Sequence, residues 1–216
     1  MIEFTLWDII RHLGTGLAWT GGLSLIAFVL GGVAGLGVLI ARISPCRPAS
    51  RAARIYIEFF QGTPLLMQLF LIFFGLGLLG VNISPLLTAA LGLTLFTSAY
   101  LAEIWRGCVE SIAPGQWEAG QCLALSRRQQ LRFVILPQAV RIAIPPTVGF
   151  SVQVVKGTAV TSIIGFMEIT KTGSMIANAT FNPLLVYGLV GVGYFLMCYP
   201  LSALARRAER RFQCRS

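Results

Sequence analysis

Three long stretches of the chain contain no charged side chain. Asp, Glu, Lys and Arg are absent from residues 12–41, 59–102 and 172–205, and only 12% of all residues are charged, against about a quarter in soluble domains. A helix needs about 20 apolar residues to cross a bilayer. The first and third stretches therefore each hold one span, and the second holds two, with residues 80–85 as the break between them.

A fourth apolar region is irregular. Residues 142–155 are uncharged but too few to cross a bilayer, so a span here has to continue past Lys156 to Phe166. Pro145 and Pro146 are expected to kink it. A lysine and irregular backbone at membrane depth are tolerated only against protein or a watery cavity. The five expected spans are residues 17–41, 55–79, 86–105, 139–166 and 183–205.

The basic residues lie between the apolar blocks of this chain, whose net charge is +9. They form three groups: Arg42, Arg47, Arg51 and Arg54; Arg106, Arg127, Arg128, Arg132 and Arg141; and Arg206, Arg207, Arg210, Arg211 and Arg215. Positive charge collects in cytoplasmic loops. Placing all three groups inside requires an odd number of spans, with the N-terminus outside and the C-terminus inside. This arrangement, rather than nucleic-acid binding, explains the basic charge.

We therefore predict an all-α membrane protein that forms a single domain over residues 1–216. Residues 1–14 are expected to form a short interfacial helix, because charges are mixed with apolar residues there. The spacing Gly31-x-x-x-Gly35 allows close helix approach, and generic helix packing is the favoured reading. The arginine-rich tail either fixes topology or binds anionic lipid, and the first reading is favoured.

Several classes of site are missing from the sequence. The five cysteines form no CxxC pair, which argues against a metal centre or a disulfide framework. No GxxxxGK[ST] motif occurs, so this chain cannot hydrolyse ATP by that route. Without a metal cluster, a nucleophile elbow or paired buried carboxylates, we expect neither an enzyme nor a bound cofactor or metal.

The stretch between the third and fourth spans is not a simple loop. Residues 116–131 are good helix formers, Pro114-Gly115 is a start signal and Pro137 a stop signal. We therefore expect a short helix within a coupling segment, residues 114–131, on the cytoplasmic side. A polar-faced helix in this position requires a partner to dock on.

This segment resembles the EAA loop of binding-protein-dependent ABC permeases. The positions concerned are Glu118, Ala119, Gly120, Ala124, Leu136 and Pro137. Gly120 stands in place of the third alanine-type residue, and Ala124 stands where a glycine is usual. Both substitutions keep a small residue. The resemblance implies that Glu118 contacts an ATPase subunit.

Other segments resemble the polar amino acid branch of that family. They are residues 59–69, 99–107, 112–116 and 154–158, the last with Gly157 in place of an acid. The resemblance implies an importer in the bacterial inner membrane. It further implies ABC ATPase subunits that use ATP and Mg, a second permease subunit (the same chain or a paralogue), an external solute-binding protein and an amino acid substrate.

Candidate pathway residues lie in three of the spans. Lys156 either attracts a substrate carboxylate or is paired or directed to the outer interface. Glu103 either forms an ion pair with Arg106, three residues on, or contacts a substrate amino group. The amides of Gln68 and Gln153 and the hydroxyl of Thr158 are weaker candidates.

A break is expected in the second span. Gly62, Thr63 and Pro64 either open the helix backbone near the pathway or form a plain proline kink. The alternative to the permease reading is a self-contained channel or secondary carrier. Such proteins normally show more spans, internal repeats or several buried carboxylates, so co-purification with an ATPase chain separates the two readings.

Overall fold

The computed structural model describes residues 5–213, which form helices and no strands. The helices are α1 (Leu6–Ile43), α2 (Arg47–Gly62), α3 (Leu65–Phe70), α4 (Leu76–Leu78), α5 (Pro85–Glu110), α6 (Pro114–Cys122), α7 (Arg127–Gln129), α8 (Leu136–Gly157), α9 (Ile169–Thr180) and α10 (Pro183–Gln213). Wide π-helical turns join α3 to α4 and α7 to α8, and a 3-10 turn follows α8.

Four of the described helices are long and apolar enough to cross a membrane: α1, α5, α8 with its flanking turns, and α10. A fifth span exists if α2 and the helix from Leu65 to Leu78 are counted as one, with a bend of 107° between them. The expected all-helical class is therefore confirmed. A break was expected at Gly62, Thr63 and Pro64 within the span over residues 55–79, and the chain turns sharply there, at Thr63 and Pro64.

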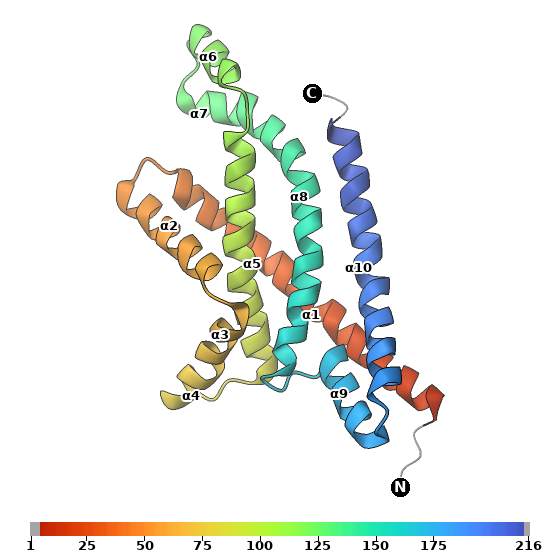
Figure 1. Cartoon of the computed structure of the whole chain (residues 1–216). Helices are drawn as coiled ribbons and strands as arrows, with labels where there is room; N and C mark the ends of the chain where they lie inside the picture. The colour runs from red at the N-terminus through yellow and green to blue at the C-terminus, as the bar shows by residue number, and fades with distance from the viewer. Residues whose placement is uncertain (1–4, 214–216) are drawn as a thin grey trace.

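The first helix begins at Leu6 and not at residue 17, so the expected separate interfacial helix is absent from its described part, residues 5–14. The Thr5 hydroxyl caps this helix by accepting from the Asp8 N–H, and the Asp8 carboxylate accepts in return from the Thr5 N–H. At 1.5 Å per residue, 38 residues extend about 57 Å, well beyond a hydrocarbon core of about 30 Å. The helix accordingly runs obliquely behind α5 and α8 (Figure 1).

The fourth span is continuous from α7 through α8. Pro137 does not stop it: the wide π-helical turn Gln130–Ile135 directly precedes α8, and the backbone stays helical through Ile135 into α8. Pro145 and Pro146 lie inside α8, which continues to Gly157 and then tightens into a 3-10 turn, Thr158–Ser162. The other spans reach beyond their expected ends, α5 to Glu110 and α10 to Gln213.

Small residues bring α1 and α5 into close contact. A Cβ on Gly31 would lie 2.6 Å from the side chain of Thr97, and a Cβ on Gly35 would lie 2.8 Å from the carbonyl oxygen of Ser98. Such distances are closer than atoms can approach, so both positions require glycine. This crossing supports the main core, which also includes Leu93 of α5.

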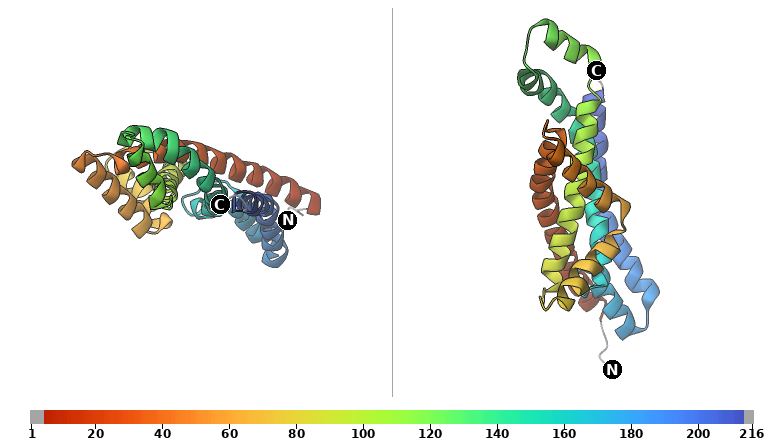
Figure 2. Two further views of the ribbon diagram at one scale, coloured as in Figure 1. Left: turned by 90° about the horizontal axis from the view of Figure 1, so that it is seen from above. Right: turned by 90° about the vertical axis from the view of Figure 1, so that its left-hand side faces the viewer.

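The helix α9 packs against α1 and α10 at the end of the molecule that holds the N-terminus (Figures 1 and 2). Its cap is the carboxylate of Glu168, which is fully buried and accepts from the N–H groups of Thr170 and Lys171 and from the Tyr194 hydroxyl. Burial raises the pKa of the Glu168 carboxyl above its usual value, and these hydrogen bonds oppose that shift.

The two ends of the described chain lie at opposite ends of an elongated molecule (Figures 1 and 2). The α6 and α7 segments lie at the same end as the C-terminal part of α10 (Figure 1). This placement agrees with an odd number of crossings, and with α6, α7 and the basic end of α10 sharing one side of the membrane.

The α1–α5 contact gives a direct test. Replacing Gly35 by alanine should destabilise the protein by about 1–3 kcal/mol, because the carbonyl of Ser98 belongs to backbone and cannot move aside cheaply. Thermal unfolding in detergent would then show a lower midpoint. Gly37→Ala is the matched control, since nothing lies within 4 Å of its Cβ position. An equal loss in both variants would contradict the close-contact account.

Candidate functional site

The α6–α7 segment is a pair of helices joined by a tight turn. The expected single helix over residues 116–131 is wrong: α6 ends at Cys122, and α7 starts after Ser126, whose hydroxyl accepts from the Gln129 N–H. Between them, Ala124 N–H donates to Gln121 O at 2.8 Å and Leu125 N–H donates to Gly120 O at 3.1 Å. This is the Schellman hydrogen-bond pattern, which ends a helix with a left-handed residue.

Ala124 is that left-handed residue, with φ of +52°. A Cβ in this conformation costs about 1–2 kcal/mol, which is why glycine usually occupies such positions. The resemblance noted above places a glycine at this point in related loops. The left-handed conformation explains why a glycine is usual here, and in this chain alanine holds the same turn at a cost in strain.

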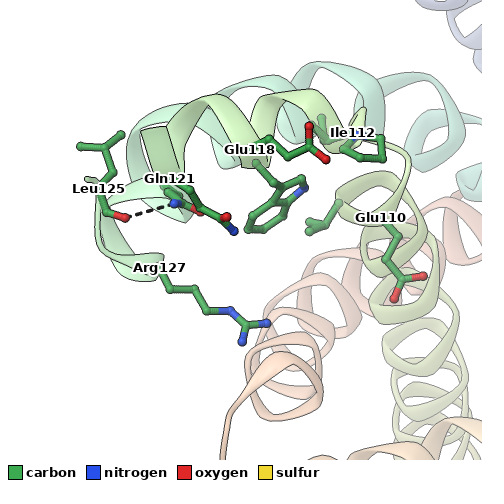
Figure 3. Close-up of a pocket in the computed structure, with 10 residues that line it drawn as sticks. Glu110, Ile112, Glu118, Gln121, Leu125 and Arg127 are labelled. Carbon is green, nitrogen blue, oxygen red and sulfur yellow. Dashed lines mark hydrogen bonds between the residues drawn. The ribbon is translucent and has the colours of Figure 1, made fainter. Parts of the chain in front are cut away.

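Gly120 holds the two helices of the segment together. A Cβ at this position would lie 2.9 Å from Cγ of Gln130, so only glycine permits the approach. The buried Gln130 amide then donates to Leu125 O at 3.0 Å, across the turn (Figure 3). The turn is thus held by the contact of Gly120 with Gln130 and by the hydrogen bond from Gln130 to Leu125. Both interactions lie within the projecting segment itself.

A small apolar core attaches the segment to the spanning helices. Val109 at the end of α5 and Ile112 just beyond it pack with Ile135 and Ala139, and Trp117 of α6 packs against this cluster. α6 is therefore packed against the ends of α5 and α8.

Beside Trp117 lies a hollow of about 740 Å³. Glu118 and Gln121 of α6 line it together with Glu110, and Arg127 lies across the opening (Figure 3). The residues expected to couple to a partner, Glu118 and Ala119, are exposed, and Leu136 and Pro137 are exposed at the start of α8. The arrangement presents an exposed carboxylate on a rigid element at the end of the molecule.

The polar groups at the break in the second span bond to one another. The amide nitrogen of Gln68 donates to Phe60 O at 2.9 Å and to Thr63 O at 3.1 Å, and Thr63 Oγ1 donates to Phe59 O at 2.7 Å. Gln68 is 4% exposed. The hydroxyl and the freed carbonyls considered for substrate are thus used inside the chain, while Gly62 and Pro64 remain exposed.

The ion pair expected between Glu103 and Arg106 is formed. The guanidinium of Arg106 donates to both carboxylate oxygens of Glu103, at 2.9 and 2.6 Å, and pairs with Glu110 as well. Glu103 also lines a polar hollow of about 300 Å³ with Arg42 and Gln61. Its carboxylate is therefore both paired and open to a cavity.

The candidates on α8 and on the 3-10 turn after it separate into two sets. Gln153 and Lys156 lie three residues apart, on the exposed side of the helix, and point away from the core of this chain. Thr158 is fully buried, and its hydroxyl donates to Val155 O at 2.7 Å. Sequence reasoning did not single out Glu168, although it is the one carboxylate between residues 119 and 208.

These helices and the projecting segment define a class of protein: a multi-pass helical membrane protein that presents a rigid two-helix element at one end for a partner. Residues 33–213 match the family described as the binding-protein-dependent transport system inner membrane component. The chain belongs to this family, and it is a permease subunit of an ABC transporter. In that family the ATPase is a separate subunit, so the carrier alternative no longer has support.

Its relatives include permease proteins of amino acid transport systems. The chain is 35% identical over 210 residues to the glutamine transport system permease protein GlnP of Escherichia coli (strain K12), covering 96% of both chains. It is 32% identical over 211 residues to the L-cystine transport system permease protein TcyB of Bacillus subtilis (strain 168), covering 95% of this chain and 90% of TcyB.

A solved structure shares the fold closely. The crystal structure of an amino acid ABC transporter with histidines superimposes with a TM-score of 0.91 at 31% identity, covering 97% of this chain and all of the other. The broken second span and the two-helix projection therefore belong to a known permease architecture.

The strained turn yields the second test. Ala124→Gly should stabilise the α6–α7 turn by about 1 kcal/mol, because glycine adopts φ of +52° without a Cβ penalty. Amide hydrogen exchange across residues 120–130 should slow. Ala119→Gly is the matched control and should speed exchange, since glycine inside a helix costs about 1 kcal/mol. Faster exchange in the Ala124→Gly variant would refute the strain argument.

Proposed function

We propose that this chain imports polar amino acids across a bacterial inner membrane as part of an ATP-driven transporter. The observation that carries the proposal is the exposed, rigid α6–α7 element joined to α5 and α8 by the cluster around Trp117. The amino acid substrate rests on the relatives, which include permeases named for glutamine and for L-cystine. An external solute-binding protein delivers the substrate.

ATP and Mg act in the partner ATPase and not in this chain. On ATP-driven closure, the ATPase subunits displace α6, and the contacts of Trp117 with the ends of α5 and α8 pass this movement to the spanning helices. A second permease subunit, the same chain or a paralogue, completes the pathway. The exposed residues Gln153 and Lys156 then line the pathway together with the hollow beside Glu103.

Glu118 is the proposed contact to the ATPase, within a docking surface that includes Ala119, Leu136 and Pro137. Gly120 and Ala124 give the surface its shape. Because Glu118 is exposed on a helix that this chain packs from the other side, its carboxylate is available to a partner.

Charge reversal tests this contact. Glu118→Lys should reduce the amount of ATPase that co-purifies in mild detergent by about tenfold, since an interfacial charge pair contributes on the order of 1–3 kcal/mol. Partners are identified and quantified by mass spectrometry. Glu58→Lys makes the same charge change on α2 and should leave association intact. If Glu118→Lys keeps stoichiometric ATPase and coupled uptake, Glu118 is not the contact.

Lys156 is the proposed partner of the substrate carboxylate. Lys156→Met should raise the substrate concentration for half-maximal uptake by about tenfold or more, because removing one partner of a desolvated charge pair is costly. Uptake is measured in proteoliposomes holding the full transporter. Lys171→Met, which changes the chain's other lysine, is the control. Normal uptake by the Lys156→Met transporter at normal expression would remove the residue from the pathway.

A further inference from the structure

The last turns of α10 carry a compact basic cluster. α10 continues as a helix to Gln213, and its arginines at 206, 207, 210 and 211 are all exposed. None of the ion pairs found among the residues the structure describes includes these four side chains. Four guanidinium groups therefore face outward on an ordered helix and not in a loop.

The cluster lies on a defined side of α10. At about 100° per residue, Arg206, Arg207 and Arg210 fall on the same side of the helix as four exposed apolar residues about two to five turns earlier. Those residues are Val192, Phe195, Leu196 and Tyr199. The buried residues of α10, such as Val186 and Val190, lie on the opposite side and pack against α1 and α9.

The exposed apolar residues of α10 indicate which environment surrounds this side of the helix. Side chains such as Phe195 and Leu196, each 62% exposed on a spanning helix, have hydrocarbon as their natural environment. Beyond Tyr199, this side of α10 passes from the hydrocarbon into the region of the lipid headgroups. The arginines begin at that level.

We propose that Arg206, Arg207, Arg210 and Arg211 form a binding site for the phosphate groups of anionic phospholipids. The planar guanidinium donates two parallel hydrogen bonds to a phosphate, which a lysine ammonium cannot match. Glu209 is the only carboxylate among residues 206–211, so the cluster keeps a positive balance. In Figure 1 and in the view from above in Figure 2, the C-terminal end of α10 lies apart from α6 and α7, which favours lipid over the ATPase as the occupant.

Lipid binding by the purified transporter tests this proposal. Native mass spectrometry measures how many phosphatidylglycerol molecules remain bound, with phosphatidylcholine as the neutral reference. Arg206→Gln with Arg210→Gln should weaken phosphatidylglycerol binding at its strongest site by about fivefold or more. Arg47→Gln with Arg51→Gln is the matched control, because it also removes two exposed arginines spaced four apart, from the start of α2.

The control pair should change phosphatidylglycerol binding by less than about twofold, and Arg206→Lys with Arg210→Lys should retain part of it, since charge persists without the planar fork. Equal losses in the two glutamine pairs would reduce the effect to net charge and overturn the site. Loss of ATPase from the Arg206/Arg210 variant, with phosphatidylglycerol binding unchanged, would assign the cluster to the ATPase and equally overturn it. Both readouts are independent of which solute is transported.

Discussion

Hydrogen bonding of the backbone inside lipid is the constraint on which this structure depends. With no water in the hydrocarbon region, every N–H and C=O needs a partner within the protein, and a helix provides them all. After Gly62 the helix breaks, and the carbonyl groups released there need other hydrogen-bond partners. There the Gln68 amide takes up the carbonyls of Phe60 and Thr63, and the Thr63 hydroxyl takes up that of Phe59. One buried glutamine thus permits a bend of 107°.

The backbone N–H and C=O groups of the projecting segment also need hydrogen-bond partners, but they find them in a different way. Outside the lipid, α6 can end, and the Schellman bonds to Gly120 and Gln121 close it with Ala124 in a left-handed conformation. The resulting element is short, and Gln130 fixes it from inside. Trp117 of α6 packs against the apolar cluster at the ends of α5 and α8, so side-chain contacts as well as the backbone join the projection to the spanning helices.

The sequence predicts where the spans lie better than it predicts their shapes. Gaps in charge locate four of the five expected spans, because a charge in lipid is costly, whereas the fourth span required the helix to continue past Lys156. The break at residues 62–64 was expected, but its angle of 107° was not, and neither were the helix running from Leu6 and the turn at Ala124. Each depends on a contact remote in sequence or on a cap: Gln68 with Phe60, Thr5 with Asp8, and Gly120 with Gln130. The candidate site residues were selected from the sequence by the chemistry of their side chains. The sequence did not show that Gln68 and Thr158 form hydrogen bonds within the chain, because these bonds depend on how the helices pack.

The exposed side of α8 argues that one copy of this chain is incomplete. Lys156 lies about 22 Å along the helix from Arg141 at 1.5 Å per residue, which places it within the membrane, yet its side chain points away from the core. A lysine and a glutamine facing hydrocarbon at that depth would be strongly unfavourable. Protein or water must therefore cover Gln153 and Lys156. The second permease subunit and aqueous pathway proposed above would meet that requirement on this side of α8.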